Sequence, residues 1–528
     1  MEFKEYLNLS FNQLVGLPET KRDLFYCFIE MIKDGRGESV ILTGNRRVGK
    51  TTLFKQLATE VPDALYVSFE LAEDTYDAST LVDGIIDGIL SGKYKTIFLD
   101  EVTKAFYYDE KLKTIVDIAW QHGVSVFITS SCKRYLQQLA HGMLGARVHL
   151  IEMRGLSYLE YLFMFGGAKG QRKYSMSWDI EEIETAIQEM DEIGVSKESF
   201  LDYLIYVQRH GFTGGVTDYI ESSYSDLIES EQALSIMRGE NINGVDFEVA
   251  KELLYVQQYA LITAYRNKMM FFKAAGSYGR ERDALGVLNV KVAKKVTSNL
   301  DTELSKRLAA LNERKREELC NALSLLYQIG LVKKVCTIES EEDIWDVIME
   351  ARREREGCKA LTVDDIFSSL YVVSDLGTYL CILRDFLSEL NISLEREVLQ
   401  GSLLGEIIEY FVRSQVMDVA GEEIGFKLKC RELRNAKEID VYSRKLSLLI
   451  GVGGKSAKDL AFCDSEFSEK YPDYANCERV YVSSGFTQEG NILPYKKHNG
   501  YTEIAYWIFV VYADAVINGQ VARRLHIT

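Results

Sequence analysis

The sequence predicts an α/β fold whose first domain is built on a parallel sheet. Short apolar segments with strand character alternate with longer segments that carry apolar residues at helical spacing, and this alternation is typical of parallel sheets covered by helices. Two of the apolar segments end in residues with distinctive chemistry, one in a glycine-rich turn with a lysine and one in a pair of carboxylates. Because ligands bind at the carboxyl ends of parallel strands, both segments predict a ligand site.

Length and composition limit the remaining interpretations. The chain has 528 residues, which suggests two to four domains at roughly 150 residues each. Its net charge of −17 argues against a protein that coats nucleic acid with its whole surface. No apolar run approaches the ~20 residues of a membrane helix, and the start of the sequence lacks signal-peptide character. The nine cysteines form no C-x-x-C pair, so we expect reduced thiols and a cytoplasmic location without membrane contact.

The first chemical signal is the turn after the apolar residues 40–43. It follows the pattern G-x-x-x-x-G-K-[ST], between an expected strand and an expected helix. Backbone N–H groups of such a loop, together with a helix N-terminus, bind phosphate oxygens. We therefore expect Lys50 to reach the β- and γ-phosphates and Thr51 to hold Mg²⁺. The expected nucleotide-binding residues are Gly44, Asn45, Arg46, Arg47, Val48, Gly49, Lys50, Thr51 and Thr52.

The second signal is the apolar segment 96–99, which runs directly into Asp100 and Glu101. About fifty residues after a phosphate-binding loop, this pattern favours a Walker B strand over a strand that simply meets a solvated turn. Asp100 is then expected to hold Mg²⁺, directly or through water, and Glu101 to polarise the attacking water. Residues 124–131 form a further apolar strand that ends in hydroxyls. Its tip, with Thr129 and Ser131, is either a γ-phosphate sensor or ordinary turn chemistry.

In their order along the chain, these segments resemble the prokaryotic AAA-plus ATPases, of the archaeal-ATPase-like kind, that carry a C-terminal restriction-endonuclease-like domain of unknown function. The resemblance rests on residues 44–52, 97–101, 128–131, 145–148 and 156–161. It implies a P-loop NTPase sheet of the additional-strand (ASCE) type, with the 124–131 strand between the Walker A and Walker B strands. It also implies ATP and Mg²⁺ as ligands, and Arg147 as a γ-phosphate contact in cis or from a neighbouring subunit of a homo-oligomer. The family usually has glycine where this chain has Ser130.

The middle of the chain resembles the family only in pattern. We expect the ATPase core in residues 1–155, a helical lid in 156–240 and a helical, winged-helix region in 241–340. Basic residues outnumber acids between 291 and 334, and Gly330 is expected to turn into the wing. This basic region is either a DNA-binding surface or a solvated face with intrahelical ion pairs, and the sequence favours the second.

The last domain, 341–528, follows the order of a restriction-endonuclease-like core, with Glu409 on an expected helix and Asp440 on an expected strand. Such sites use carboxylates to hold Mg²⁺ and a lysine to orient water. Gly451 stands where the resemblance calls for a glutamate, and Lys455 lies two residues late. The sequence therefore favours a nuclease-like fold used for structure or binding over an active nuclease.

These features together predict a Mg²⁺-dependent ATPase, with Lys50, Glu101, Ser131 and Arg147 as catalytic residues and Thr51 and Asp100 as metal ligands. The first alternative is an ATP-gated binding protein for DNA or a protein partner, with little turnover. The second is an ATP-coupled nuclease.

Overall fold

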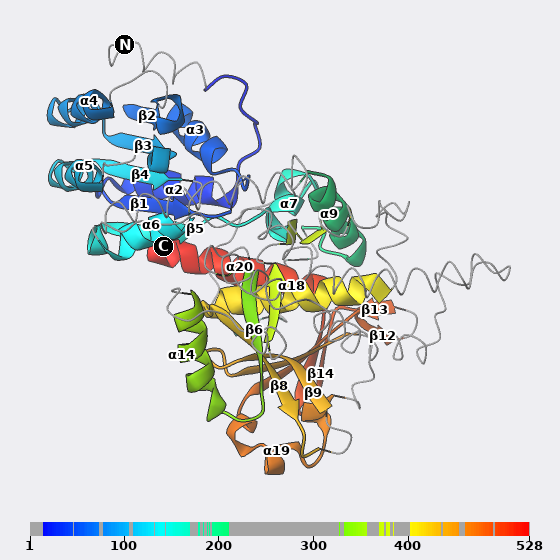
Figure 1. The fold of residues 1–528 in the computed structure, drawn as a ribbon. Coiled ribbons are helices and arrows are strands. Elements are labelled where there is room, and N and C mark those ends of the chain that lie inside the picture. The colour runs from blue at the N-terminus through cyan, green and yellow to red at the C-terminus, as the bar shows by residue number, and fades with distance from the viewer. Residues whose placement is uncertain are drawn as a thin grey trace, which may run out of the picture. The chain divides into compact units, whose positions relative to one another are not determined.

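The computed structural model divides into two compact units (Figure 1). The first comprises the described parts of Met1–Ser177 and Ala515–Thr528, and the second those of Trp178–Phe212 and Asp246–Asp514. The described residues are 14–45, 47–72, 78–104, 109–130, 133–142, 144–168, 193–210, 332–355, 369–373, 402–433, 437–453, 460–488 and 491–526, with single positions between 178 and 190, at 327 and between 376 and 384.

The first unit contains a five-stranded sheet in the order β2-β3-β4-β1-β5, with every neighbouring pair parallel. Its strands are β1 (Ser39–Thr43), β2 (Ala64–Ser68), β3 (Thr96–Asp100), β4 (Ser125–Thr129) and β5 (Val148–Glu152). β4 lies between β1 and β3, as predicted. The sheet therefore confirms the expected P-loop NTPase class, in which an extra strand separates the two motif strands.

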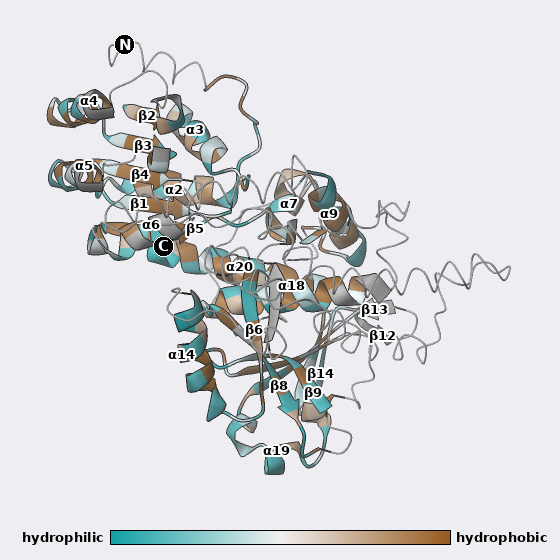
Figure 2. Ribbon diagram, viewed as in Figure 1, coloured by the Kyte–Doolittle hydropathy of each residue, from teal (hydrophilic) through white to brown (hydrophobic). Residues whose placement is uncertain are grey.

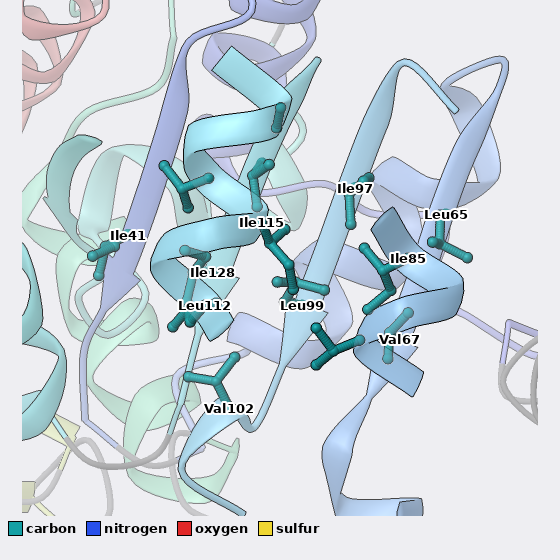
Figure 3. Packing of buried hydrophobic residues seen from close by; sticks show 14 of the residues in the cluster. Ile41, Leu65, Val67, Ile85, Ile97, Leu99, Val102, Leu112, Ile115 and Ile128 are labelled. Carbon is teal, nitrogen blue, oxygen red and sulfur yellow. The ribbon is translucent and has the colours of Figure 1, made fainter. Parts of the chain in front are cut away.

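Helices pack on both faces of this sheet because successive strand residues point to opposite sides. The helices are α2 (Asp23–Asp34), α3 (Lys50–Glu60), α4 (Ala78–Leu90), α5 (Asp109–Gln121), α6 (Lys133–His141) and α7 (Tyr158–Met164). On one face, Ile97 and Leu99 pack against Ile85 of α4 and Ile115 of α5 (Figure 3). Figure 2 shows the central strands as largely hydrophobic, as expected for strands that are buried on both sides.

The other face of the sheet carries an aromatic core. Phe98 and Phe127 stack with ring centroids 5.0 Å apart, and Phe54 of α3 and Phe28 of α2 pack beside them. Leu525, from the last residues of the chain, belongs to the same cluster and is 2% exposed. The C-terminal segment therefore completes the core of the first unit.

The second unit is built on an eight-stranded mixed sheet in the order β14-β15-β11-β10-β9-β8-β6-β7. Its strands are β6 (Val332–Ile338), β7 (Ser369–Val373), β8 (Ile424–Cys430), β9 (Lys437–Ser443), β10 (Leu448–Val452), β11 (Glu478–Ser483), β14 (Tyr495–His498) and β15 (Tyr501–Ala505), with β12 (Phe486–Gln488) and β13 (Asn491–Leu493) as a separate hairpin. The helices are α9 (Lys197–His210), α14 (Asp343–Arg355), α18 (Ser402–Ala420) and α19 (Phe467–Lys470). α20 (Tyr506–Arg524) follows β15, and its residues from Ala515 onward belong to the first unit. β8, β9 and β10 are antiparallel neighbours, and β11 is parallel to β10.

The structure differs from the predicted domain plan at two places, and a third part of the plan lies outside the described residues. β6 pairs with β7 and β8 in the large sheet, so Val332–Ile338 is a sheet strand and not the wing that we expected after Gly330. The predicted lid, 156–240, contributes α7 to the first unit and α9 to the second. Apart from Tyr327, residues 241–331, which include most of the predicted winged helix and basic region, lie outside the described residues. Among the helices that the structure describes, none is long and apolar enough to cross a membrane.

Candidate functional site

The loop after β1 has the backbone of a close-wrapping turn. Gly44 has φ 145° and Gly49 has φ 100°, and Arg47 also has a positive φ of 63°. A Cβ atom at Gly44 would lie 2.2 Å from the carbonyl oxygen of Met153, so no larger residue fits there. α3 begins at Lys50, directly after Gly49, and the N-terminal end of a helix therefore faces the loop.

The Lys50 side chain is held inside this loop. Its Nζ donates hydrogen bonds to the carbonyl oxygens of Gly44 (2.9 Å) and Asn45 (3.0 Å), and the residue is 6% exposed. A buried ammonium group that bonds to main-chain carbonyls is positioned to meet an anion at the mouth of the loop. The contact of Lys50 with the β- and γ-phosphates stays a prediction.

Thr51 and Asp100 meet across the carboxyl edge of the sheet. The Thr51 hydroxyl donates to Asp100 Oδ1 at 3.3 Å, and the Tyr66 hydroxyl donates to Asp100 Oδ2 at 2.8 Å. The pKa of Asp100 is raised to about 6: burial raises it most and the neighbouring charge of Glu101 adds to this, while hydrogen bonds from Tyr66 and Thr51 and the charge of Lys50 offset part of the rise. The hydroxyl of Thr51 and the carboxylate of Asp100 are hard oxygen donors that suit Mg²⁺.

Glu101 follows Asp100 in an uncommon backbone conformation. Its φ is 53°, a left-handed value that costs a non-glycine residue of order 1–3 kcal/mol and is concentrated at functional sites. The Ser130 hydroxyl lies 3.4 Å from Glu101 Oε2, and Thr103 Oγ1 lies 2.5 Å from Ser130 Oγ. The carboxylate of Glu101 is therefore in contact with the tip of β4.

The structure brings four of the predicted site residues, Lys50, Thr51, Asp100 and Glu101, to one edge of the sheet. Asn45, Arg47, Val48 and Thr52 belong to the same loop and the first turn of α3. Arg46 and Ser131 lie outside the described residues, so the sensor role predicted for Ser131 stays a prediction. The other hydroxyl of that strand tip, on Thr129, donates to the Leu42 carbonyl oxygen at 2.7 Å and so joins β4 to β1.

Arg147 does not join these residues within the chain. It directly precedes β5, whose first residue, Val148, pairs with Ser39 at the start of β1. The phosphate-binding loop leaves the other end of β1, and Arg147 instead forms a 3.1 Å ion pair with Asp117 of α5. The in-cis contact is therefore not present, and a role toward a neighbouring subunit stays a prediction.

Sequence reasoning missed three side chains that touch the site. Tyr66 donates to Asp100, Ser130 donates to Glu101, and Thr103 contacts Ser130. Only Ser130 lies in a segment on which the resemblance rests, and no role was expected for it. Ser130 carried one usable signal, because the resembling family usually has glycine at that position. Tyr66 carried none, since its contact depends on the pairing of β2 with β3.

In the second unit, the two carboxylates predicted for a nuclease-like site are occupied by protein groups. Glu409 Oε1 accepts from Arg413 Nη2 at 2.5 Å and from Lys427 Nζ at 3.3 Å. Burial alone raises the pKa of Glu409, but the charges of Lys427 and Arg413 and their hydrogen bonds outweigh it and lower the pKa overall. Asp440 Oδ2 accepts from the backbone N–H of Val452 at 2.8 Å.

The position expected to supply a third carboxylate is filled by a neighbouring side chain. A Cβ at Gly451 would lie 2.5 Å from Leu460 Cδ2, so Leu460 occupies the space that a glutamate would need. The part of the chain that the structure describes contains no group of three or more histidine, cysteine or acidic side chains able to hold a metal ion. Lys455 lies outside the described residues.

The parallel sheet of the first unit, with its helices and the loop after β1, fits the fold of the P-loop NTPases. In agreement, residues 36–162 match the family profile described as an AAA domain, which supports a nucleotide-binding ATPase. The solved structure of C. elegans PCH-2 is similar with 13% identity and a TM-score of 0.21, over 35% of this chain and 52% of that chain. The chain thus spans about half the length of that protein. No curated protein sequence matches the chain significantly.

Proposed function

We propose that this protein binds ATP with Mg²⁺ and hydrolyses it at the carboxyl edge of the first sheet. Lys50 stabilises charge that develops on the phosphates, and Glu101 accepts the proton of a water that attacks the γ-phosphate in line. Thr51 and Asp100 are the residues that would hold Mg²⁺, which when bound neutralises charge on the β- and γ-phosphate oxygens. In this proposal Ser131 senses the γ-phosphate, and Arg147 contacts the γ-phosphate that is bound to a neighbouring subunit.

The observation that carries this proposal is the 3.3 Å contact between the Thr51 hydroxyl and Asp100. These residues are 49 positions apart in sequence, and they come from the two motifs that share a metal ion in P-loop NTPases. The buried position of Lys50 beside them and the AAA-domain match over residues 36–162 support the same function.

The direct test is phosphate release from ATP by the purified chain in the presence of Mg²⁺, with Lys50→Ala as the blank. We expect Glu101→Gln to lower turnover by about 100-fold or more, because the loss of a general base typically costs 10²–10⁴ in rate, while ATP binding persists. Equal turnover by the wild type and Lys50→Ala would exclude the proposed site. A Glu101→Gln protein with full turnover would exclude Glu101 as the base and leave nucleotide binding intact.

An ATP-gated binding protein with little turnover is the second candidate, and the contact of Ser130 with Glu101 favours it. A base that bonds to a neighbouring hydroxyl is less available to water until something displaces that hydroxyl. Duplex DNA and a protein partner are the proposed triggers, so phosphate release is measured with and without DNA. Turnover that rises with DNA would make region 291–334 the next target, whereas flat turnover would direct attention to a protein partner.

For the second unit we propose a nuclease-like fold that serves structure or binding. The order α18, β8, β9, β10 and then a parallel β11 supports the likeness to that fold. Arg413 and Lys427 on Glu409, together with Leu460 against Gly451, support the absence of cleavage. Mg²⁺-dependent cleavage of DNA that disappears in Asp440→Ala would overturn this assignment.

A further inference from the structure

Arg22, at the N-terminal end of α2 and outside every recognised motif, connects three parts of the first unit. Its Nε donates to Glu160 Oε1 at 2.8 Å, and its Nη1 donates to the carbonyl oxygen of Val48 at 2.9 Å. Its Nη2 donates to the carbonyl oxygens of Arg154 (2.9 Å) and Gly155 (3.1 Å). One planar guanidinium therefore ties the phosphate-binding loop to the segment between β5 and α7.

Glu160 holds the other side of this guanidinium. The carboxylate also accepts from the backbone N–H groups of Asp23 (2.9 Å) and Ser157 (3.1 Å), the second as part of a capping box at the start of α7. The side chains of Arg22 and Glu160 are only 17% and 6% exposed. Since each nitrogen of the guanidinium has a fixed partner, its orientation toward Val48 is well determined.

The contact with Val48 bears on the chemistry of the loop. The Val48 carbonyl and the Gly49 N–H belong to the same peptide group, and in a planar trans peptide these two groups point in opposite directions. A donor that fixes the carbonyl therefore also fixes the direction of the N–H. In loops of this pattern, backbone N–H groups are the ones that cradle the phosphates.

We propose that Arg22 is a positioning residue for nucleotide binding, which holds the Val48–Gly49 peptide so that the Gly49 N–H faces the phosphates of ATP. The inference rests on the proposed ATP-binding function of the loop. It adds to that function a residue that never touches the nucleotide and acts through the Val48 carbonyl. A backbone N–H that contacts a phosphate serves the bound substrate and the transition state alike, so its loss weakens binding more than turnover.

The test compares ATP affinity, KM and kcat of Arg22→Lys with those of the wild type. Lysine keeps the charge but cannot make the fork-shaped set of contacts. We expect Arg22→Lys to raise the Kd and KM for ATP roughly tenfold, the effect of losing one hydrogen bond to a charged group, while kcat stays within about twofold. A Kd and KM equal to those of the wild type would overturn the inference.

Two further variants separate positioning from general stability. Ile115→Ala leaves a cavity in the core on the α4 and α5 side of the sheet, away from Arg22 and the phosphate-binding loop, so we expect a lower melting temperature with ATP affinity close to that of the wild type. Lys33→Met removes an exposed ion pair with Glu30 on the same helix, at 3.0 Å, and should change neither property. If the loss of ATP affinity follows melting temperature across the three variants, Arg22 is structural and the inference fails.

The failure of this inference is distinguishable from failure of the proposed function. A wild-type protein that binds no ATP, like Lys50→Ala, would remove the proposed function and the inference with it. A wild type that binds ATP, with an unchanged Arg22→Lys affinity, would remove the inference alone.

Discussion

The Ser130 hydroxyl lies 3.4 Å from Oε2 of Glu101 and 2.5 Å from the hydroxyl of Thr103. The carboxylate that we propose as the base is therefore held from the adjacent strand, and Ser130 itself is fully buried at the tip of β4. The availability of Glu101 to an attacking water therefore depends in part on the Ser130 hydroxyl. A variant of that hydroxyl tests whether the contact restrains the base or assists it.

Ser130→Ala should raise basal phosphate release about twofold to fivefold, the rate equivalent of losing a restraining hydrogen bond of about 0.5–1 kcal/mol. ATP affinity should not change, because Ser130 contacts the base and not the phosphate-binding loop. Ser125→Ala, a buried serine at the opposite end of the same strand, is the matched control. A drop in turnover that approaches that of Glu101→Gln would mean that Ser130 assists the base.

Tyr66→Phe should destabilise the nucleotide-free protein by about 1.5–3 kcal/mol. The change removes a 2.8 Å hydrogen bond to a carboxylate that is 1% exposed, and bonds to charged groups contribute about this much. Urea denaturation measures the difference in the free energy of unfolding. Tyr94→Phe is the control, since Tyr94 is a buried tyrosine of the same unit whose hydroxyl makes no hydrogen bond to any described residue. Equal effects from the two variants would show that the bond to Asp100 contributes nothing.

The Arg22–Glu160 pair predicts a loss of stability on the acid side. Burial alone raises the pKa of the Glu160 carboxyl, but the charge of Arg22 and the hydrogen bonds from Arg22, Asp23 and Ser157 lower it below the ordinary value of 4.5. As the pH falls, the unfolded chain therefore takes up this proton first. The stabilisation is present above pH 4.5 and is lost as the pH falls from there toward the lower pKa of the folded state.

Urea denaturation at a series of pH values checks this prediction. The difference in the free energy of unfolding between the wild type and Glu160→Gln should be constant near neutrality and should shrink below pH 4.5. Glu30→Gln, on the exposed pair with Lys33, should show no such trend. A difference that grows toward acid pH would contradict the assigned direction of the pKa.

The local motifs predicted the parts of the site that depend on neighbours in sequence. The residue pattern of the loop 44–52 and that of the strand ending in Asp100 each predict a local conformation, because spacing within one turn or one strand is a local property. The family resemblance that rests on these segments also implied that β4 lies between β1 and β3, which the sheet confirms. Contacts between motifs could not be predicted in this way.

Long-range pairing explains what the sequence did not reveal. Val332–Ile338 follows a glycine and reads as a wing, but its partner strand β8 begins at Ile424, far along the chain. Tyr66 meets Asp100 only because Ser68 pairs with Asp100 in the register of β2 and β3. Leu525 enters the core around Phe28 from the opposite end of the sequence. Neither apolar periodicity nor composition carries information about such partners.

Lys334, the last residue of the basic region 291–334, forms a buried ion pair with Glu354. The expectation of an exposed basic surface is therefore wrong at this residue. The side chains of Lys334 and Glu354 are 5% and 0% exposed, and Lys334 Nζ lies 2.7 Å from Glu354 Oε2. The adjacent Lys333 forms an ion pair with Asp418 at 2.8 Å. Lys334→Met should therefore cost about 3–5 kcal/mol of stability, because it leaves a buried charge without its partner. The double variant Lys334→Met/Glu354→Leu should recover most of that loss. A phosphate contact at Lys334 would instead reveal itself as a reduced salt dependence of DNA binding with unchanged stability.

The last turns of the chain should be required for the stability of the first unit. Leu525 is 2% exposed in the aromatic core, and Asn518 Nδ2 donates to Asp23 Oδ2, a buried carboxylate, at 2.7 Å. Leu525→Ala should cost about 2–5 kcal/mol through the cavity that it leaves. Asn518→Ala should cost about 1 kcal/mol or more, since Asp23 would lose a donor. The measurement is urea denaturation of the full chain. Unfolding and ATP binding are each followed as the urea concentration rises.

Arg524→Ala provides the control for both variants, because Arg524 is exposed on the same helix and a surface change there should stay within about 0.5 kcal/mol. If Leu525→Ala is no more destabilising than Arg524→Ala, the C-terminal segment does not belong to the core of the first unit in solution. If Leu525→Ala lowers stability and ATP binding is lost at the same urea concentration as the fold, the two ends of the sequence form one cooperative unit. That result would mean that the stability of the phosphate-binding loop depends on the C-terminal segment, which bonds to Asp23 of α2 through Asn518, 495 residues further along the chain.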